Sequence, residues 1–365
     1  MVTAVVMVGE GSTESTPRAW VQQARREAAR DLLEQLLCLE EVGRVVLVTP
    51  DVAGLELPGV EVVPSAPGSV HVGKTLARLV RDFGIERLLY AGGGSAPLLS
   101  AEMLARVVRR LREAERLVLT NNRFSSDWAA VTPATTLLRH VERLPRDNML
   151  GWVLSTEGGL PPEALPASGA SRLDIDTPID LLALRLHPAT HPGLRRYLDG
   201  LPLPVERLHA VVDVLATPAS QLFIAGRVAP DAWRALNEAT RCWLRVLAEE
   251  RGMVSSGRQE RGEVFSLLAA HLEITGIERF FETLPTWADA ALLDTRVLLA
   301  HHKLWPSDDD RFASDLGWAE QVGDPWLRRL TGAAVEAGVP VLLGGHGLMA
   351  GALFALAELV PPPES

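Results

Sequence analysis

Short hydrophobic runs alternate with amphipathic stretches through the first 125 residues, and this alternation constrains the fold more than any other feature of the chain. Between Pro17 and Leu39, apolar residues recur on one face with helical spacing. Strand and helix in turn predict right-handed βαβ units and a mainly parallel sheet flanked by helices. The expected strands are Ala4–Val8, Arg44–Val48, Val60–Val63, Arg87–Tyr90 and Arg116–Leu119, and the expected helices are Pro17–Leu39, Gly73–Phe83 and Ala101–Glu113.

The pattern changes after His187–Pro204, a segment rich in proline and glycine that we expect to be a linker. We therefore predict two domains, an α/β domain over residues 1–200 and a mostly α-helical domain over residues 205–365. Two short apolar runs beyond the linker, Gln221–Ala225 and Val339–Leu343, are also compatible with strands. The helices expected in this half are Asp231–Glu250, Glu263–Thr275, Trp287–His301, Trp318–Ala337 and Leu348–Leu359.

Charge and composition limit the classes of partner that the chain can bind. Its net charge of −10 argues against a nucleic-acid backbone as the main partner. No apolar run is long enough to cross a bilayer, and the first residues predict a buried strand and not a signal peptide. The two cysteines, Cys38 and Cys242, are expected to be free thiols. These features predict a cytoplasmic protein that binds neither nucleic acid nor membrane, and they leave a homodimer open.

Two glycine-rich segments follow expected strands. The first contains Gly9, Gly11 and Ser12, and the second contains Gly92, Gly93, Gly94 and Ser95. Glycines at these places allow the backbone to approach a phosphate, which exposed N–H groups can bind. A tight turn between strand and helix also requires glycine, so each segment has a purely structural explanation. Parallel sheets bind ligands beyond the carboxyl ends of their strands, which favours a ligand site.

A third motif contains closely spaced carboxylates. It runs Asp174-Ile175-Asp176-Thr177-Pro178, and in a strand the two aspartates would point to the same side. Two carboxylates on one face repel each other unless a cation or hydrogen-bond donors lie between them. Thr177 and Pro178 are the expected cap and first residue of a helix, with Asp180 completing a capping box. Capping of nearby backbone is the structural alternative for the aspartates.

In this order, the three motifs resemble those of the small nucleotidyltransferases that include molybdenum-cofactor guanylyltransferases and 2-phospholactate guanylyltransferases. The resemblance covers residues 1 to about 185 and rests on Gly94-Ser95-Ala96-Pro97-Leu98-Leu99 and on the segment from Asp174 to Leu181. It implies a GT-A-like α/β fold and a transferase of cofactor biosynthesis. It also implies a purine nucleoside triphosphate and a small anionic acceptor as substrates, with Mg²⁺ bound only together with the nucleotide.

The chain departs from the family pattern at two places. Ser95 stands where the family has the aspartate that binds the catalytic Mg²⁺, and a neutral hydroxyl is a much weaker ligand for a hard cation. The basic residue that usually follows the first glycines is absent, and Arg18 is the nearest candidate. The resemblance then assigns catalysis to Asp174, Asp176 and Arg18. It assigns the metal to Asp174 and Asp176, with help from Asp127, and nucleotide binding to the two glycine segments.

The second half contains polar clusters without a family resemblance. They include Asp294-Thr295-Arg296, the pair His301 and His302, and the turn Gly344-Gly345-His346-Gly347. Ion-pair networks and helix caps are the more common explanation for such clusters. The Gly-Gly-His-Gly turn is the strongest candidate for an anion site, because a glycine-rich start of a helix suits a phosphate.

Two functions therefore remain. The first is a divergent nucleotidyltransferase that joins a nucleoside triphosphate to a small phosphorylated or carboxylated acceptor and releases pyrophosphate. The second is a catalytically inactive nucleotide- or phosphate-binding protein whose second domain is regulatory or binds a partner. The loss of the central aspartate favours the second function, and the retained Asp-Ile-Asp-Thr-Pro motif favours the first.

Overall fold

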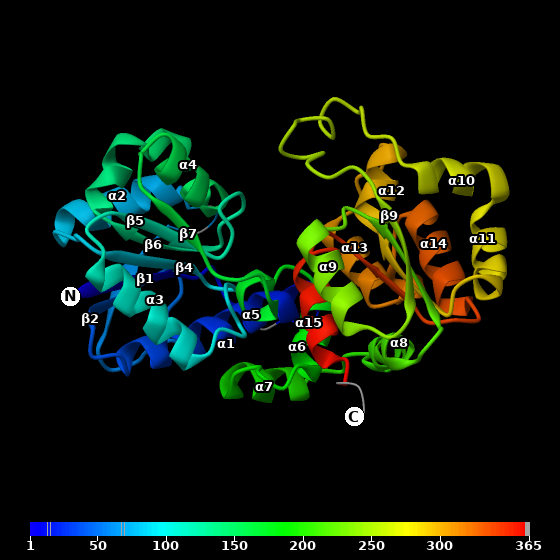
Figure 1. The fold of residues 1–365 in the computed structure, drawn as a ribbon, viewed down its shortest axis with the longest axis horizontal. Coiled ribbons are helices and arrows are strands. Elements are labelled where there is room, and N and C mark those ends of the chain that lie inside the picture. The colour runs from blue at the N-terminus through cyan, green and yellow to red at the C-terminus, as the bar shows by residue number, and fades with distance from the viewer. Residues whose placement is uncertain (13, 15, 67, 69, 362–365) are drawn as a thin grey trace. The chain divides into compact units, whose positions relative to one another are not determined.

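The computed structural model describes residues 1–365 except residues 13, 15, 67, 69 and 362–365. The chain forms two compact units, each with its own β-sheet (Figure 1). The first unit comprises Met1–Glu14, Gln22–Ile175 and Ala189–Asp199, and the second comprises Ser15–Val21, Asp176–Pro188 and Gly200–Ser365. The chain is therefore not divided at a single point near residue 200.

The first unit contains a seven-stranded sheet in the order β3-β2-β1-β4-β6-β5-β7. Only β6 runs antiparallel to its neighbours, so the prediction of a mainly parallel sheet is confirmed. All five strands expected from the sequence are present, and β6 and β7 are additional. The strands are β1 (Val2–Met7), β2 (Val42–Thr49), β3 (Val60–Pro64), β4 (Leu88–Gly92), β5 (Leu117–Thr120), β6 (Trp128–Thr132) and β7 (Pro162–Ala164).

Helices cover both faces of this sheet (Figure 1). In β1, Ala4 and Val6 pack with α1 and α3, whereas Val5 packs with α2 and α4 on the other face. Burial on both faces explains why β1 is apolar except at Thr3 and does not alternate with polar residues. The helices are α1 (Pro17–Leu37), α2 (Val72–Asp82), α3 (Ala101–Glu113), α4 (Leu150–Thr156), α5 (Gly169–Arg172) and α7 (Pro192–Asp199), with short 3₁₀ turns at Ala134–Arg139, Val141–Arg143 and Asp147–Met149.

The second unit is mostly helical, as predicted, around a small sheet in the order β11-β10-β8-β9. All four strands are parallel, and their apolar residues form a core with helices α10 to α14. The strands are β8 (Gln221–Gly226), β9 (Trp243–Ala248), β10 (Ala290–Asp294) and β11 (Val341–Gly344). The helices are α6 (Pro178–Leu186), α8 (Glu206–Ala216), α9 (Pro230–Ala239), α10 (Leu267–Thr275), α11 (Ile277–Thr283), α12 (Thr295–His301), α13 (Asp308–Asp315), α14 (Pro325–Glu336) and α15 (Gly351–Leu359), with 3₁₀ turns at Leu284–Thr286 and Ala319–Gln321.

Two helices predicted for this half are wrong in part. The expected helix Asp231–Glu250 ends as α9 at Ala239, and its remainder contains the strand β9. The expected helix Trp287–His301 contains the strand β10 before α12 begins. All five residues of β10 are buried, and an apolar run without alternation does not distinguish a buried strand from a buried helix. Both short apolar runs that were compatible with strands form strands, β8 and β11.

None of the helices in the described part of the chain combines the length and the apolar character that a membrane span requires.

Candidate functional site

The two glycine segments of the first unit follow neighbouring strands. Strands β1 and β4 are parallel and adjacent, with Met7 opposite Gly92, so both segments leave the sheet at its carboxyl edge. The second segment packs against the end of β1 at Gly93. A Cβ atom there would lie 3.3 Å from the Met7 carbonyl oxygen and 3.3 Å from the Val8 methyl groups. A larger residue at Gly93 would therefore press against the end of β1.

The first segment presents unused hydrogen-bond donors. The backbone N–H groups of Gly9, Glu10, Gly11 and Ser12 donate no hydrogen bond to any residue that the structure describes. Gly9 and Glu10 are exposed, and Gly11 and Ser12 are half-buried. Successive unpaired N–H groups at the end of a strand are a recurrent way of binding a phosphate, because each one can donate to a phosphate oxygen.

A buried arginine fixes the position of this segment. Arg26, from α1, is 3% exposed and donates to the carbonyl oxygens of Gly9 at 2.9 Å and Asp51 at 3.0 Å. Its guanidinium also lies 3.5 Å from the Asp51 carboxylate, which follows β2. Arg26 therefore ties the end of β1 to the end of β2. Arg18, the basic residue that the sequence predicts for this role, is exposed and belongs to the segment grouped with the second unit.

Ser95 has a structural hydrogen bond. Its hydroxyl donates to the carbonyl oxygen of Asp127 at 2.8 Å, and the same carbonyl accepts the N–H of Gly92 at 3.2 Å. The Asp127 carboxylate accepts a hydrogen bond from the Asn121 amide at 2.6 Å. Ser95 also forms an isolated antiparallel bridge with Asp174, and the Ile175 N–H donates to the Gly94 carbonyl at 3.2 Å. The second glycine segment is thus joined to the third motif.

Three carboxylates lie around the second glycine segment, namely Asp127, Asp147 and Asp174. The Tyr90 hydroxyl donates to Asp147 at 2.9 Å, and a Cβ atom on Gly94 would lie 3.2 Å from an oxygen of Asp174. Burial raises the pKa of Tyr90 well above its usual value, and the negative charges of Asp147, Asp127 and Asp174 raise it further. Asp147 was not identified from the sequence, because it lies in a 3₁₀ turn outside every recognised motif.

The geometric reason given for the aspartate motif is wrong. Asp174 lies in an isolated bridge with Ser95 and not in a strand, so Asp174 and Asp176 do not alternate along a strand. Asp174 belongs to the first unit, whereas Asp176 is exposed and belongs to the second. The predicted capping box is present: the carboxylate of Asp180 accepts the Thr177 N–H at 2.7 Å at the start of α6.

The carboxylates that the structure describes in the first unit do not form a preassembled metal site. Among the described residues, the one group of three possible ligands with ligand atoms within 4.8 Å of one another is Glu273, His301 and His302, in the second unit. Asp174 lies beside the glycine segment, 3.2 Å from the position of a Cβ atom on Gly94, but a Mg²⁺ ion there would need further oxygen ligands. Nucleotide phosphates and water commonly provide those ligands for Mg²⁺.

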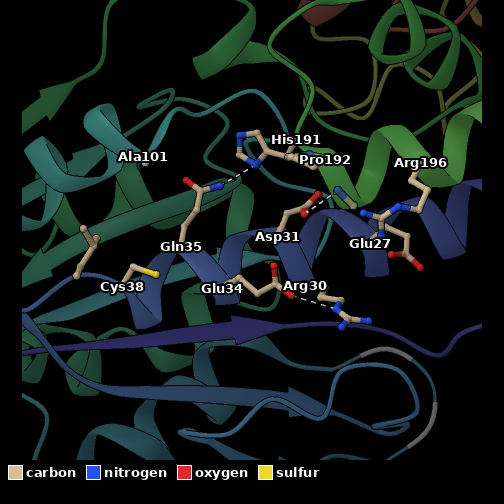
Figure 2. A pocket seen from close by; sticks show the side chains of 12 residues that line it. Glu27, Arg30, Asp31, Glu34, Gln35, Cys38, Ala101, His191, Pro192 and Arg196 are labelled. Atoms are coloured by element: carbon tan, nitrogen blue, oxygen red, sulfur yellow. Dashed lines mark hydrogen bonds and ion pairs between the residues drawn. The ribbon is translucent and has the colours of Figure 1, made fainter.

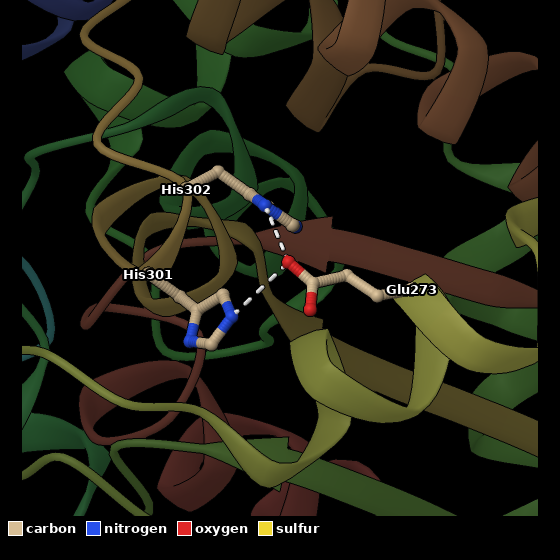
Figure 3. A group of neighbouring side chains, drawn as sticks. All are labelled: Glu273, His301 and His302. Carbon is tan, nitrogen blue, oxygen red and sulfur yellow. Dashed lines mark ion pairs between the residues drawn. The ribbon is translucent and has the colours of Figure 1, made fainter.

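The cluster of Glu273, His301 and His302 is better explained as a group of side chains in which both histidines pair with the carboxylate (Figure 3). The Nδ1 atom of His301 accepts the backbone N–H of Ser266 at 3.1 Å, which places the ring proton on Nε2. That Nε2 atom lies 3.5 Å from the Glu273 carboxylate, and Nδ1 of His302 lies 3.4 Å from the same oxygen. A metal at this position would have to displace the proton that the Ser266 contact holds on Nε2.

We expect Zn²⁺ not to raise the thermal midpoint of unfolding through this cluster, because one of its three ligands is protonated at the facing nitrogen. Differential scanning fluorimetry with and without equimolar Zn²⁺ measures this. Glu273→Gln is the control, since it removes the carboxylate. A stabilisation by Zn²⁺ that disappears in Glu273→Gln would contradict the prediction, whereas one that persists arises elsewhere on the chain.

A groove of about 510 Å³ lies between α1 and α7 in the first unit (Figure 2). The Asp31 carboxylate accepts the N–H groups of Gly193 at 3.0 Å and Leu194 at 2.8 Å, so it caps the start of α7. The side chain of Gln35 lies 2.7 Å from Nδ1 of His191. These contacts hold the two helices together. The residues that line the groove include none from the glycine segments.

Comparison with known protein families finds no match to this chain, and comparison with curated proteins finds none. Several solved structures resemble its first half. A cytidylyltransferase from Leptospira borgpetersenii is 18% identical, covering 54% of this chain and 91% of its own, with a TM-score of 0.39. A putative nucleotide-diphospho-sugar transferase from Desulfovibrio desulfuricans is 14% identical, covering 54% and 94%, with a TM-score of 0.40. A 2-C-methyl-D-erythritol 4-phosphate cytidylyltransferase from Thermus thermophilus is 16% identical, covering 49% and 95%, with a TM-score of 0.34.

Proposed function

We propose that the first unit binds a nucleoside triphosphate at the carboxyl ends of β1 and β4. The observation that carries this proposal is the row of N–H groups from Gly9 to Ser12, which have no acceptor among the described residues and are held in place by Arg26. These groups bind the phosphates, and the glycines from Gly92 to Gly94 leave room beside them for the rest of the nucleotide. The expected nucleotide is a purine, from the resemblance to the guanylyltransferases.

The reaction that this arrangement supports best is nucleotidyl transfer. An oxygen of a small phosphorylated or carboxylated acceptor forms a bond to the α-phosphorus, and the bond from that phosphorus to pyrophosphate breaks. Bound Mg²⁺ would neutralise the charge on the phosphates. We propose Asp174 as a ligand for this ion, with Asp176 and Arg18 as further participants. The protein contributes mainly by positioning the phosphates and the acceptor.

Ser95 supports a second candidate function, in which the protein binds a nucleotide without catalysis. Its hydroxyl donates a hydrogen bond to the Asp127 carbonyl, so Ser95 stabilises the conformation of the loop. A chain that has lost the central carboxylate while keeping the glycine segments would retain phosphate binding and lose the metal-dependent step.

Binding with and without the metal distinguishes the two candidates. We expect Mg²⁺ to tighten the binding of ATP or GTP by about tenfold, or about 1.4 kcal/mol, and Asp174→Asn to abolish this difference. Calorimetry with ATP, GTP, CTP and UTP, each with and without Mg²⁺, measures it. Asp82→Asn, an exposed residue at the end of α2, is the control with the same loss of charge.

Equal affinity with and without Mg²⁺ would favour the binding protein. A Mg²⁺ effect that survives in Asp174→Asn would remove the reason for assigning this residue to the metal. Tighter binding of CTP than of GTP would overturn the purine assignment.

A further inference from the structure

The order of strands in the second sheet marks a position where ligands commonly bind. From β8 the chain passes through α9 to β9 on one side, and it then returns to form β10 on the other side of β8. The direction of winding therefore reverses between β8 and β10. In open parallel sheets, ligands bind outside the carboxyl ends of the strands at such a reversal. Arg227 follows β8 at this edge, Asp294 ends β10, and the turn of residues 345–348 follows β11.

A buried ion pair joins the two central strand ends. Arg227 donates to the Asp294 carboxylate through Nε at 2.6 Å and through Nη2 at 3.0 Å. The Asp294 side chain is fully buried, whereas that of Arg227 is 12% exposed. Gly226 allows the close approach: its φ is +132°, and a Cβ atom there would lie 2.2 Å from the Cβ atom of Asp294. The sequence thus places a fixed guanidinium at the reversal point.

The turn after β11 presents unused donors, as the first glycine segment does in the other unit. In the described part of the chain, the N–H groups of Gly345, His346, Gly347 and Leu348 donate no hydrogen bond. A hydrogen bond fixes the start of the turn: the Thr295 hydroxyl donates to the Gly344 carbonyl at 3.1 Å. Four successive donors without acceptors would be costly in a closed interior, and they form a concave anion site when a phosphate binds.

An unpaired acceptor lies against the same turn. Asp180 is fully buried, and its Oδ2 atom accepts from the N–H groups of Asp176 and Thr177 at 3.0 Å and 2.7 Å. Its Oδ1 atom has no hydrogen-bond partner among the described residues. A Cβ atom on Gly347 would lie 2.8 Å from that oxygen. Burial, and then the charge of Asp176, raises the pKa of Asp180 to about 7. A ligand with both a phosphate and an O–H group would satisfy the donors of the turn and this acceptor together.

The charges around the turn favour an anion. His346 is exposed, yet enough protein surrounds its ring to lower its pKa, and the charges of Arg227 and Arg251 lower it further. Arg251 lies on the segment that follows β9. The Asp294 charge nearby is neutralised by its bidentate pair with Arg227. Two guanidinium groups therefore act on the exposed end of the turn, and the charge of Asp176 opposes them.

We propose that the carboxyl edge of the second sheet is a binding site for the phosphate group of a small molecule. The N–H groups of residues 345–348 hold the phosphate oxygens, and Arg227 supplies positive charge. Oδ1 of Asp180 accepts the O–H of hydrogen phosphate, or a hydroxyl carried by the phosphorylated molecule. This site is distinct from the nucleotide site proposed for the first unit and does not depend on it.

Hydrogen exchange on the full-length protein tests the proposal. Unpaired N–H groups exchange rapidly, so a phosphate on the turn should slow the exchange of the peptide that spans residues 344–349. The probes are inorganic phosphate, ADP and glucose 6-phosphate, each at millimolar concentration. If all three probes protect this peptide, the site recognises the phosphate group itself. If only ADP or only glucose 6-phosphate protects it, the ligand is a nucleotide or a sugar phosphate, respectively. No protection of residues 344–349 by any probe overturns the site, whatever happens at residues 9–12.

Substitutions test the assignment of Arg227. We expect Arg227→Gln to weaken phosphate binding at the turn by about tenfold, as loss of a charged donor does. This change leaves the buried charge of Asp294 without a counter-charge. The double variant Arg227→Gln with Asp294→Asn removes that charge and should fold with the same weakened binding. Arg329→Gln, which removes an exposed arginine paired with Glu278, is the matched control. Equal weakening in Arg329→Gln, or unchanged binding in the double variant, would contradict the role of Arg227.

Discussion

Arg26→Met is expected to lower the affinity of the protein for a nucleoside triphosphate by about 100-fold, or about 2.7 kcal/mol. Methionine keeps much of the length and apolar stem of arginine but removes every donor. The carbonyl groups of Gly9 and Asp51 then lose the guanidinium that holds them. The segment from Gly9 to Ser12 would sample many conformations, and ordering it again would oppose phosphate binding.

Calorimetric titration with ATP and GTP measures this change. Arg30→Met is the matched control, because Arg30 lies one turn further along α1 and pairs with Glu34 at the surface. It should bind with nearly the affinity of the unmodified protein. An Arg26→Met protein that keeps its melting transition and its nucleotide affinity would show that Arg26 does not position the phosphate segment.

Arg296→Met is expected to destabilise the protein by about 3–5 kcal/mol, the usual cost of removing one partner of a buried ion pair. Both guanidinium Nη atoms of Arg296 donate to the carboxylate of Asp315, which is fully buried. Burial raises the pKa of Asp315 even beside this arginine, so the carboxylate depends on its partner for compensation. Without Arg296, the group would be left charged and desolvated, or would take up a proton.

Urea denaturation followed by tryptophan fluorescence measures the free energy of unfolding. The double variant Arg296→Met with Asp315→Leu should recover most of the loss, because it leaves no charge in the interior. Arg329→Met, at the exposed pair with Glu278, should change stability little. A single variant as stable as the control, or a double variant no better than the single one, would contradict this account.

The regular part of the first unit could be predicted because its strands and helices have distinct periods. The strands β1 and β4 are apolar runs between amphipathic helices, and local pattern alone identifies them. Strand β6 was missed, since Trp128–Thr132 is fully buried between two antiparallel neighbours, and its pairing depends on contacts distant in sequence. In the second sheet, β8 and β11 were anticipated as possible strands. Strand β10 was missed because a buried apolar run does not distinguish a strand from a helix, and β9 was missed because it continues an amphipathic helical pattern.

The candidate site was predicted less completely than the fold. The glycine segments were found because a turn at a strand end limits the choice of residue. Arg26 was not found, because an arginine in the middle of a helix looks like a solvated residue until the chain places its guanidinium under a loop. Asp147 depends on Tyr90, which is 57 residues away along the chain. Such pairings follow from tertiary structure and leave no local signal.

The path of the chain limits how this protein can be taken apart. The backbone passes from one unit to the other five times, because Ser15–Val21 and Asp176–Pro188 group with the second unit and Ala189–Asp199 with the first. A fragment that stops at residue 175 lacks α7, whose first turn is capped by Asp31. A fragment that starts at residue 200 lacks α6, and with it the carboxyl of Asp180 that lies against Gly347. Neither half of the gene therefore encodes a self-contained module, and a single proteolytic cut cannot release one. If the chain is divided, we expect its structure to be regained only when the two fragments are expressed together and associate.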